Sequence, residues 1–340
     1  MAVTIREVSQ RCGLSISSVS KALNNYPNVR EETRLRVLKV ANEIGYCPNI
    51  LARGLKTNKT RNIGVLLTTD VHNAMLHTFF ALMLNGFRSE ADKFGYDVTL
   101  INQRVHEKRR SLLNHIRSRN FDAVCFMCVD FADTQINDVI LSEVPCITID
   151  HAFDGSDCIL ADNKGGMRKL VDYAVRMGHT KIAYVYGTPS FVTSVRYDTF
   201  VTCMSEHRLA VPREYLIESY YHDPKASAAA TRVLLSLPNP PTCVLYPDDL
   251  CALGAIEAVR TCGLSVPNDL SIIGYDGTDV LQKISPRLTT MRQHADEIGR
   301  RAIQRLLEKV DSPNNPPHHA DIIPSALIEG ETTARIAPQA

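Results

Sequence analysis

The sequence predicts a small all-α domain at the N-terminus followed by a larger, two-lobed α/β body. Three short helical patterns fill residues 1–47, and from residue 62 onward apolar strands alternate with helical stretches. The chain has 340 residues, and single domains usually span ~100–200 residues. We therefore expect more than one domain. The composition, with 44% hydrophobic and 22% charged residues, is that of a folded globular protein.

The apolar runs and the cysteines of the sequence disfavour two classes of protein, namely membrane-spanning proteins and proteins built on a disulfide framework. No apolar run approaches the ~18 residues that span a bilayer, and the first residues lack the layout of a signal peptide, so we expect a cytoplasmic protein without membrane contact. The chain has ten cysteines, and those in apolar runs are expected to be reduced, buried thiols rather than a disulfide framework. Cys125 and Cys128 form a C-x-x-C pair with no second ligand pair, so we expect no metal site.

Charge is distributed unevenly along the chain. Residues 1–61 hold 11 Lys and Arg residues against four Asp and Glu residues, a balance of +7, whereas the remaining residues hold 27 against 33, a balance of −6. A basic head on a mildly acidic body is expected of a protein whose N-terminal part binds a polyanion such as nucleic acid.

The opening stretch, TIREVSQRCGLSISSVSKALNN, has the spacing of a helix-turn-helix. Thr4 followed by Glu7 matches a capping box, which predicts a helix from Ile5, and Gly13 is expected to end it. Ser15 can then cap a second helix. Two helices joined by a short turn that contains Gly are typical of helix-turn-helix domains.

The second helix presents a polar face. Val19 and Leu23 are four residues apart and form its apolar side. Short polar side chains and one long cation suit a helix that lies in the major groove of DNA, where base edges present a distinct donor and acceptor pattern. A solvated face of a small helical bundle has the same pattern, and periodicity alone favours that alternative. The polar face and the N-terminal tip carry Ile16, Ser17, Ser20 and Lys21.

A third helix is predicted over about residues 31–44. Its buried side is expected to carry Leu35, Leu38 and Ala41, and Gly45 is expected to end it.

From residue 62 the sequence alternates short apolar strands with helical stretches. The strands are NIGVLLTT, GYDVTLIN, FDAVCFMC, VPCITID, HTKIAYVYG, PPTCVLYP and DLSIIGYD, and the helical stretches are 79–94, 163–177, 192–207, 223–236 and 248–262. Alternation with strands rich in Val and Ile predicts parallel sheets covered by helices on both faces, in two Rossmann-like lobes. No strand is followed by G-x-G-x-x-G, and no nucleophile elbow or zinc motif is present, so we expect neither an enzyme nor a bound cofactor.

Charged residues occur where the predicted strands end. Ligands of open α/β sheets bind beyond the carboxyl ends of the strands, and several carboxylates with one guanidinium could bind sugar hydroxyls. For any single Asp, capping of the following helix is at least as good an explanation, but the set favours a binding site. The residues are Asp70, Asp150, Asp248, Asp249 and Asp276, with Arg196 as the guanidinium.

Several segments, in this order and at this spacing, closely resemble the lactose-repressor (LacI/GalR) family of bacterial transcription regulators. They are Thr-Ile-x-x-Val, the Val-Ser pair at 19–20, EETRLRV, GYCPNILARGL and NIGVLL. The resemblance runs along nearly the whole chain. It implies a helix-turn-helix domain at 1–47, a hinge helix and linker at 48–61, and a periplasmic-binding-protein-like effector and dimerisation domain at 62–335. Its N-lobe would span about 62–160 and 292–321, and its C-lobe about 161–291 and 322–335.

The hinge helix has its own sequence signal. Pro48 can begin a short helix over residues 49–55, but Gly54 and the polar residues after it make that helix marginal in isolation. In the family the matching segment folds on operator DNA, and the leucine that matches Leu55 enters the minor groove. The candidate DNA-binding residues are Thr4, Ser15, Ile16, Ser17, Ser20, Lys21, Asn25, Asn49, Arg53 and Leu55.

The resemblance also assigns effector binding. The chain departs from the usual pattern at Asp248, where Asn is common, at Gly277, where a second Asp is usual, and at Ala295, where some members place an aromatic residue. These departures prevent the identity of the ligand from being transferred from any one member. The family's effector-binding positions map onto Phe79, Asp150, Arg196, Asp248 and Asp276; together with Asp70 from the strand-end set, these are the effector-binding candidates.

These observations together predict a sequence-specific DNA-binding transcriptional regulator. We expect a homodimeric repressor of double-stranded, palindromic operator DNA, controlled by a small effector, a sugar or sugar derivative, between the two lobes. The alternative is a sugar-binding sensor that does not act through DNA, because such proteins share the two-lobed body; the basic N-terminal domain counts against it. A Rossmann-type enzyme ranks third, since the cofactor fingerprint is missing.

Overall fold

The computed structural model describes the chain in six segments and divides it into two compact units. The described residues are 3–47, 59–67, 78–102, 111–153, 156–312 and 320–336. The units are residues 1–61 and residues 62–340. Four candidate residues lie outside the described residues, as does the expected hinge helix: Asn49, Arg53, Leu55 and Asp70.

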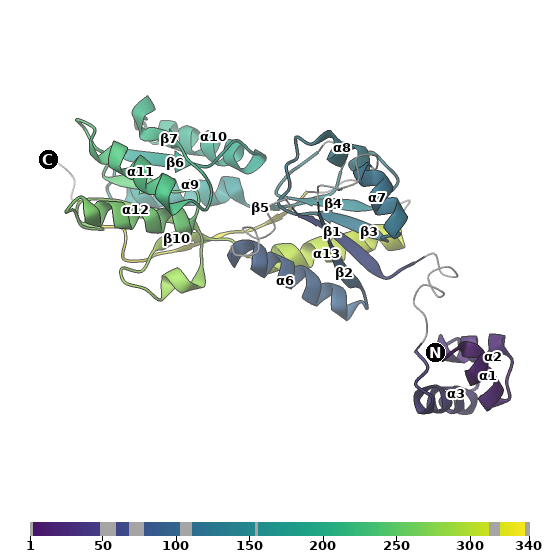
Figure 1. Cartoon of the computed structure of the whole chain (residues 1–340). Helices are drawn as coiled ribbons and strands as arrows, with labels where there is room; N and C mark the ends of the chain where they lie inside the picture. The colour runs from purple at the N-terminus through teal and green to yellow at the C-terminus, as the bar shows by residue number, and fades with distance from the viewer. Residues whose placement is uncertain are drawn as a thin grey trace. The chain divides into compact units, whose positions relative to one another are not determined.

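The N-terminal unit contains three helices, α1 (Ile5–Cys12), α2 (Ile16–Leu23) and α3 (Glu31–Glu43) (Figure 1). Gly13 caps α1 in the left-handed conformation, with φ 60°. The Ser15 hydroxyl accepts a hydrogen bond from the Ser18 amide and so caps α2, as predicted. The capping box at Thr4 was wrong in its detail: Thr4 does precede α1, but its side chain makes no capping hydrogen bond, and only its carbonyl accepts from the Glu7 amide.

The core of this unit also corrects the expectation for α3. Its buried residues are Val37 and Ala41, which pack against Val8, Val19 and other residues of α1 and α2. Leu35 and Leu38 are 59% and 39% exposed. Two apolar stripes fit the 3.6-residue period of this helix, and the tight packing of three short helices selects the stripe with the smaller side chains.

The larger unit is built on two six-stranded sheets, one in each lobe (Figure 1). The N-lobe sheet has the order β11-β5-β4-β3-β1-β2 and the C-lobe sheet has the order β12-β10-β9-β8-β6-β7. All strand pairs are parallel except β10 with β12. The N-lobe strands are β1 (Asn62–Leu67), β2 (Asp97–Asn102), β3 (Ala123–Phe126), β4 (Cys146–Ile149), β5 (Cys158–Ala161) and β11 (Ala320–Ile323). The C-lobe strands are β6 (Ile182–Tyr186), β7 (Leu216–Glu218), β8 (Cys243–Leu245), β9 (Ser271–Asp276), β10 (Thr289–Arg292) and β12 (Ala326–Ile328).

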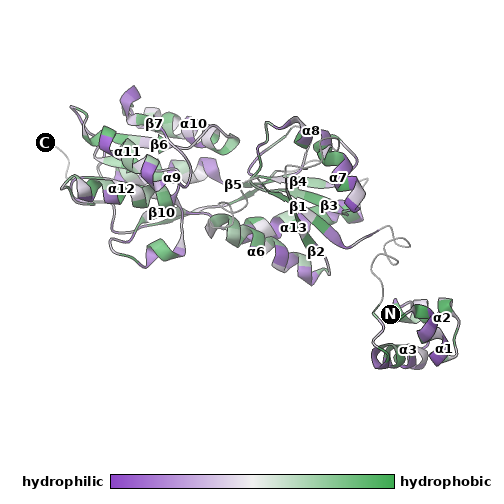
Figure 2. Ribbon diagram, viewed as in Figure 1, coloured by the Kyte–Doolittle hydropathy of each residue, from purple (hydrophilic) through white to green (hydrophobic). Residues whose placement is uncertain are grey.

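Helices cover both faces of each sheet, and this explains why the strands are apolar without alternation. In β1, Val65 packs into the cluster that includes α6 and α13, whereas its neighbour Leu66 packs into the cluster on the α7 and α8 side. Figure 2 shows the same pattern as hydrophobic strands beneath helices with hydrophilic outer faces. The N-lobe helices are α6 (Thr78–Lys93), α7 (Leu112–Arg119), α8 (Thr134–Ile140) and α13 (Ala295–Asp311), and the C-lobe helices are α9 (Asn163–Arg176), α10 (Phe191–Glu206), α11 (Pro224–Leu235) and α12 (Asp249–Thr261).

Helices α6 and α13 cross at two glycines. A Cβ on Gly86 would lie 2.2 Å from the Asp296 carbonyl oxygen, and a Cβ on Gly299 would lie 2.0 Å from the Met83 carbonyl oxygen. Glycine is therefore required at both positions for this close approach of backbones.

The chain passes between the lobes at three places in the described residues: between β5 and α9, between β10 and α13, and between β11 and β12. No described helix is both long and apolar enough to span a bilayer. Among the same residues, no cluster of three or more His, Cys, Asp or Glu side chains has the geometry of a metal site.

Candidate functional site

A cavity of about 1280 Å³ opens where the carboxyl ends of the strands of the two lobes face each other. Five of the six effector-binding candidates line it: Phe79, Asp150, Arg196, Asp248 and Asp276. Phe79 lies on α6 and Arg196 on α10, Asp150 follows β4, Asp248 caps α12, and Asp276 ends β9. The strand ends that carry these side chains therefore meet at one place in the structure, and the binding role of these side chains remains a prediction.

Arg196 is the buried cation of this cleft. It projects from α10 and is 3% exposed. Its Nε donates to Oδ1 of Asn163 at 2.7 Å, its Nη1 donates to the Pro247 carbonyl at 3.0 Å, and the guanidinium lies 3.5 Å from the centre of the Tyr275 ring. These contacts fix the side chain within the protein, and Arg196 is one of the residues that line the cavity.

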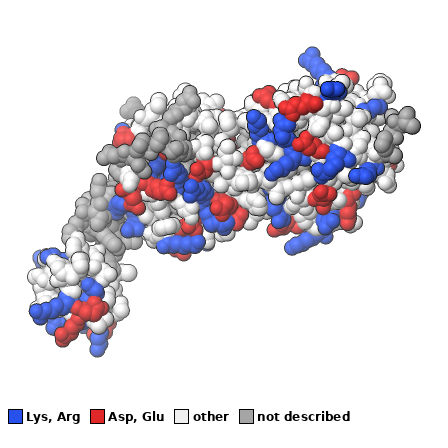
Figure 3. Space-filling model, turned by 180° about the vertical axis from the view of Figure 1, so that it is seen from behind, with Lys and Arg blue, Asp and Glu red and all other residues white. Residues whose placement is uncertain are grey.

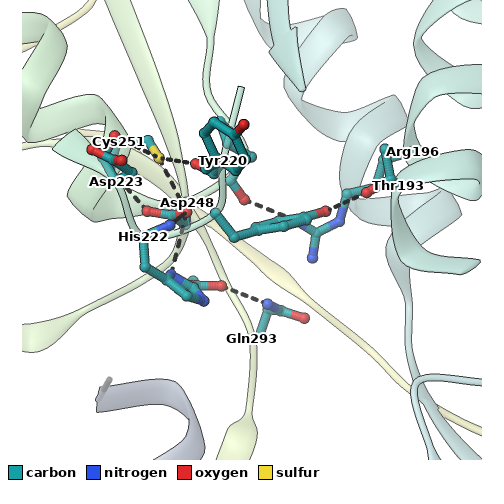
Figure 4. Close-up of polar contacts among 11 residues, drawn as sticks. Thr193, Arg196, Tyr220, His222, Asp223, Asp248, Cys251 and Gln293 are labelled. Carbon is teal, nitrogen blue, oxygen red and sulfur yellow. Dashed lines mark hydrogen bonds and ion pairs between the residues drawn. The ribbon is translucent and has the colours of Figure 1, made fainter. Parts of the chain in front are cut away.

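Both carboxylate oxygens of Asp248 accept hydrogen bonds from backbone amides of the protein. Its Oδ1 accepts from the Cys251 amide and caps α12, while its Oδ2 accepts from the His222 amide and lies 3.3 Å from the His222 ring nitrogen (Figure 4). Burial alone would raise the pKa of Asp248, but the hydrogen bonds and charge of His222 outweigh burial and lower the pKa to about 2. The capping explanation therefore applies to Asp248, which also fastens the loop between β7 and α11 to the cleft.

Asp276 is the last residue of β9, with φ 109°. Residues other than glycine rarely adopt a backbone conformation with this φ, and such conformations are concentrated at functional sites. Its Oδ1 accepts from Nε2 of Gln293 at 2.7 Å. Burial, followed by the negative charges of Asp249 and Asp248, raises the pKa of Asp276 well above its ordinary value.

Asp249 follows Asp248 in sequence but faces the C-lobe core. It is 1% exposed and accepts from the Thr290 hydroxyl at 2.5 Å and from the Thr278 amide at 2.6 Å. Burial raises its pKa to about 7. Asp249 belonged to the set of strand-end carboxylates but not to the effector-binding candidates, and it does not line the cavity.

The N-lobe side of the cleft is largely aromatic near α6. Phe79 is 8% exposed and packs in the N-lobe core, with its ring centre 5.4 Å from that of Phe80 in an edge-on arrangement. Phe80 in turn reaches across to the C-lobe, where its ring centre lies 5.9 Å from that of His222. Phe80 thus contacts the loop that Asp248 holds.

A second aromatic contact joins the lobes after β4. Asp150 accepts from the Ala161 amide at 2.8 Å, and burial raises its pKa. The next residue, His151, stacks on Phe131 with ring centres 4.2 Å apart and approaches Phe191 of the C-lobe at 5.4 Å. In each interlobe contact a Phe of one lobe meets a His of the other.

The structure adds residues that the sequence reasoning missed. Asn163 follows β5 and Gln293 follows β10, two strands that the sequence pattern did not reveal, so the strand-end rule had nothing to act on. No periodicity signal distinguished His222 or Phe80. The resemblance also pointed to position 295, but Ala295 is buried in the N-lobe core, whereas Gln293 lines the cleft.

The candidate DNA-binding residues that the structure describes lie on or beside α1 and α2. Val19 is fully buried, while Ile16 is 44% exposed at the N-terminal tip of α2. Figure 3 shows several groups of Lys and Arg atoms on the visible face of this unit, with a group of acidic atoms between them. The exposed candidates are Thr4, Ser15, Ile16, Ser17 and Asn25, and the partly exposed ones are Ser20 and Lys21.

Comparison with known proteins places these features in context. Residues 4–49 match the model of bacterial regulatory proteins of the lacI family, and residues 171–333 match a periplasmic binding protein-like domain. The probable HTH-type transcriptional repressor ExuR of Bacillus subtilis is 30% identical over 92% of this chain and 92% of its own length. The lac repressor dimer, solved with operator and the anti-inducer ONPF, has a TM-score of 0.85 at 23% identity, over 98% of this chain and all of that chain. A lacI-family regulator from Enterococcus faecium with bound ribose has a TM-score of 0.68 at 25% identity, over 81% of this chain and all of that chain.

Proposed function

Because this chain belongs to the lacI family of bacterial regulatory proteins, we propose that it is a homodimeric transcriptional repressor whose hold on operator DNA depends on a small carbohydrate between its lobes. The observation that carries the proposal is the attachment of cleft residues to the connections between lobes. Arg196 binds Asn163 at the first connection, and Asp276 binds Gln293 at the second. A ligand on Arg196 and Asp276 therefore acts where the lobe arrangement is set.

This attachment meets the thermodynamic requirement for control. A ligand shifts a conformational equilibrium only when it binds one state better than the other. Groups that lie beside the interlobe connections, and that face the opposite lobe, change their mutual distance when the lobes move. A carbohydrate is supported by the carboxylates and guanidinium of the cleft, and by the ribose in the related E. faecium protein.

For DNA we propose that α2 enters the major groove with Ser17, Ser20 and Lys21 toward the bases, and that Leu55 of the hinge segment enters the minor groove. The excess of positive charge in residues 1–61 would neutralise phosphates. A repressor of bacterial genes works in the cytoplasm, which is the compartment we propose.

Operator binding can be tested with DNA that the full-length protein selects from a random library. Fluorescence anisotropy should then give an affinity that falls steeply with salt, because bound phosphates release counterions. Lys21→Ala should reduce discrimination between operator variants, whereas Lys39→Ala, an exposed lysine on α3, serves as the matched control. An affinity that is independent of salt, or no selected sequence, would contradict repression and favour a sensor that does not act through DNA.

A further inference from the structure

The aromatic contact between the lobes after β4 is centred on a histidine. The ring of His151 stacks on that of Phe131, with ring centres 4.2 Å and planes 15° apart, and its centre lies 4.5 Å from that of Phe153. These three rings belong to the N-lobe. The ring of Phe191, the first residue of α10 in the C-lobe, lies 5.4 Å from His151. His151 is therefore the N-lobe half of an interlobe contact.

Hydrogen bonds tie the segment around His151 to the N-lobe. Asp150, the residue before it, has φ 55°, and its amide donates to the Ile159 carbonyl at 2.9 Å. The Thr148 hydroxyl donates to the His151 carbonyl at 2.6 Å. Phe191 alone of the four rings stands on the other lobe. If the lobes separate, the imidazole therefore loses Phe191 and keeps its N-lobe neighbours.

The C-lobe half of the contact is equally well fixed. Phe191 begins α10, and the Ser190 hydroxyl caps this helix by accepting from the Thr193 amide at 3.1 Å. The Thr193 hydroxyl in turn donates to the Thr188 carbonyl at 2.7 Å. Since each ring is held by its own lobe, the distance between the rings of His151 and Phe191 follows the distance between the lobes.

The surroundings of the imidazole disfavour its protonated form. Phenyl rings carry no counter-charge, and burial lowers the pKa of His151 below its ordinary value of 6.5. The described titratable groups on the segments packed against it are engaged elsewhere or uncharged. Asp130 accepts from the Ala132 amide, Asp133 caps α8, Asp150 accepts from the Ala161 amide, Asp157 pairs with Lys309, Arg196 holds Asn163 and Pro247, and burial keeps Cys128 a thiol.

From this geometry we propose that His151 and Phe191 form a proton-sensitive latch: the uncharged imidazole holds the two lobes together, and its protonation releases Phe191 and lets the lobes separate. An imidazolium needs hydration, which Phe191 restricts while the lobes are closed and which separation restores. The proposal goes beyond the proposed function, because it makes the proton a second input that acts without any ligand.

The sign of the pH effect follows from the burial of the ring. Because burial in the closed arrangement lowers the pKa of His151, its contribution to closure is complete above pH 6.5. The contribution is lost as the pH falls through the lowered pKa. Acid should therefore favour separated lobes.

The test measures the distance between the lobes as a function of pH. Spin labels on Asp138→Cys of α8 and Thr202→Cys of α10, two exposed positions, report this distance by double electron–electron resonance. The full-length protein also carries Cys47→Ser and Cys262→Ser, which remove the exposed thiols of the described residues. An excess of unlabelled protein suppresses distances between subunits. Between about pH 8 and about pH 5 the ratio of separated to closed molecules should rise about two- to tenfold, as expected for the loss of one aromatic contact.

Two variants attribute this response to the latch. His151→Phe keeps an aromatic ring but cannot bind a proton, so the distance should no longer depend on pH. Asp249, whose pKa is raised to about 7, titrates in the same range and is unchanged in this variant. Phe191→Ala removes the C-lobe ring and should separate the lobes already at about pH 8.

The matched control is His207→Gln, because His207 bonds Asp172 and does not line the cavity. It should keep the response of the wild type. A response that persists in His151→Phe, or a wild-type distance that is constant with pH, overturns the proposal. Closer lobes in acid would also overturn it, since attraction between the imidazolium and the aromatic faces would then outweigh the lost hydration.

Failure of the latch is distinguishable from failure of the proposed function. Residues 1–61 contain no histidine, so operator affinity measured by anisotropy at the same two pH values reports on the body. An affinity that changes more in the wild type than in His151→Phe would support both the latch and the link between lobe arrangement and DNA. A distance that depends on pH with equal affinity changes in the two proteins would support the latch and contradict that link.

Discussion

The two lobes contribute different chemistry to the same cleft. The C-lobe face is polar and already hydrogen-bonded: Arg196, Asp248 and Asp276 each have partners within the protein. The N-lobe face near α6 is aromatic, and Phe80 crosses to contact the C-lobe. The difference suggests a division of labour in which the C-lobe orients a ligand through rigid polar groups and the N-lobe closes over it with apolar surface.

The largest expected effect is on the polar face. Arg196→Ala should weaken ligand binding by roughly 2–5 kcal/mol, because a buried charged contact is lost. Arg196→Lys should recover little, since an ammonium cannot reproduce the planar fork that holds Asn163 and Pro247. Calorimetry with a saccharide that raises the melting temperature of the wild type measures both affinities, and gel shift without ligand checks that DNA binding persists. Wild-type affinity in Arg196→Ala would remove the polar anchor from the C-lobe face.

A smaller effect is expected on the aromatic face. Phe80→Ala should weaken ligand binding by about 0.5–1.5 kcal/mol, the worth of a specific aromatic contact. The matched control is Phe94→Ala, because Phe94 follows α6 and is 48% exposed. If Phe80→Ala costs as much affinity as Arg196→Ala, the proposed division between the lobes fails.

A third expected effect concerns stability on the C-lobe side and depends on pH. The pKa of Asp249 is raised by burial from 3.8 to about 7, so its contribution to stability is present at low pH and is lost as the pH rises through 7. The melting temperature of the wild type should therefore fall more steeply between about pH 4 and pH 7 than that of Asp249→Asn. Parallel curves for the two proteins, measured by calorimetry in matched buffers, would contradict this assignment.

The smallest effect is expected at the rim of the polar face. Lys225 is exposed at the start of α11, and rim charges contribute little to affinity. Lys225→Ala should change the affinity for a neutral ligand by less than about twofold. A loss comparable to that of Arg196→Ala would show that the ligand engages the rim rather than the interior.

Much of the architecture could be predicted because its signals are local. Strands rich in Val and Ile alternate with helices, and parallel sheets gather the ends of such strands at one edge. This rule brought Asp150, Asp248 and Asp276 together. It missed Asn163 and Gln293, because the sequence analysis did not identify β5 and β10, the strands that precede these two residues.

Other details depended on packing that no local pattern encodes. Asp248 and Asp249 are adjacent and chemically identical, but the start of α12 turns one toward the cleft and the other toward Thr290. On α3 two apolar stripes were available, and only the contacts with α1 and α2 decide that Leu35 is exposed. In both cases the choice is made by tertiary structure.

The glycine crossing of α6 and α13 links the two faces of the cleft mechanically. Helix α13 begins two residues after Gln293, and α6 carries Phe79 and Phe80 at its N-terminal end. Since the two backbones touch at Gly86 and Gly299, neither helix can slide or rotate without displacing the other. Any shift of the connection at Gln293 would therefore move α13 and α6 together, and with them the aromatic side chains of Phe79 and Phe80.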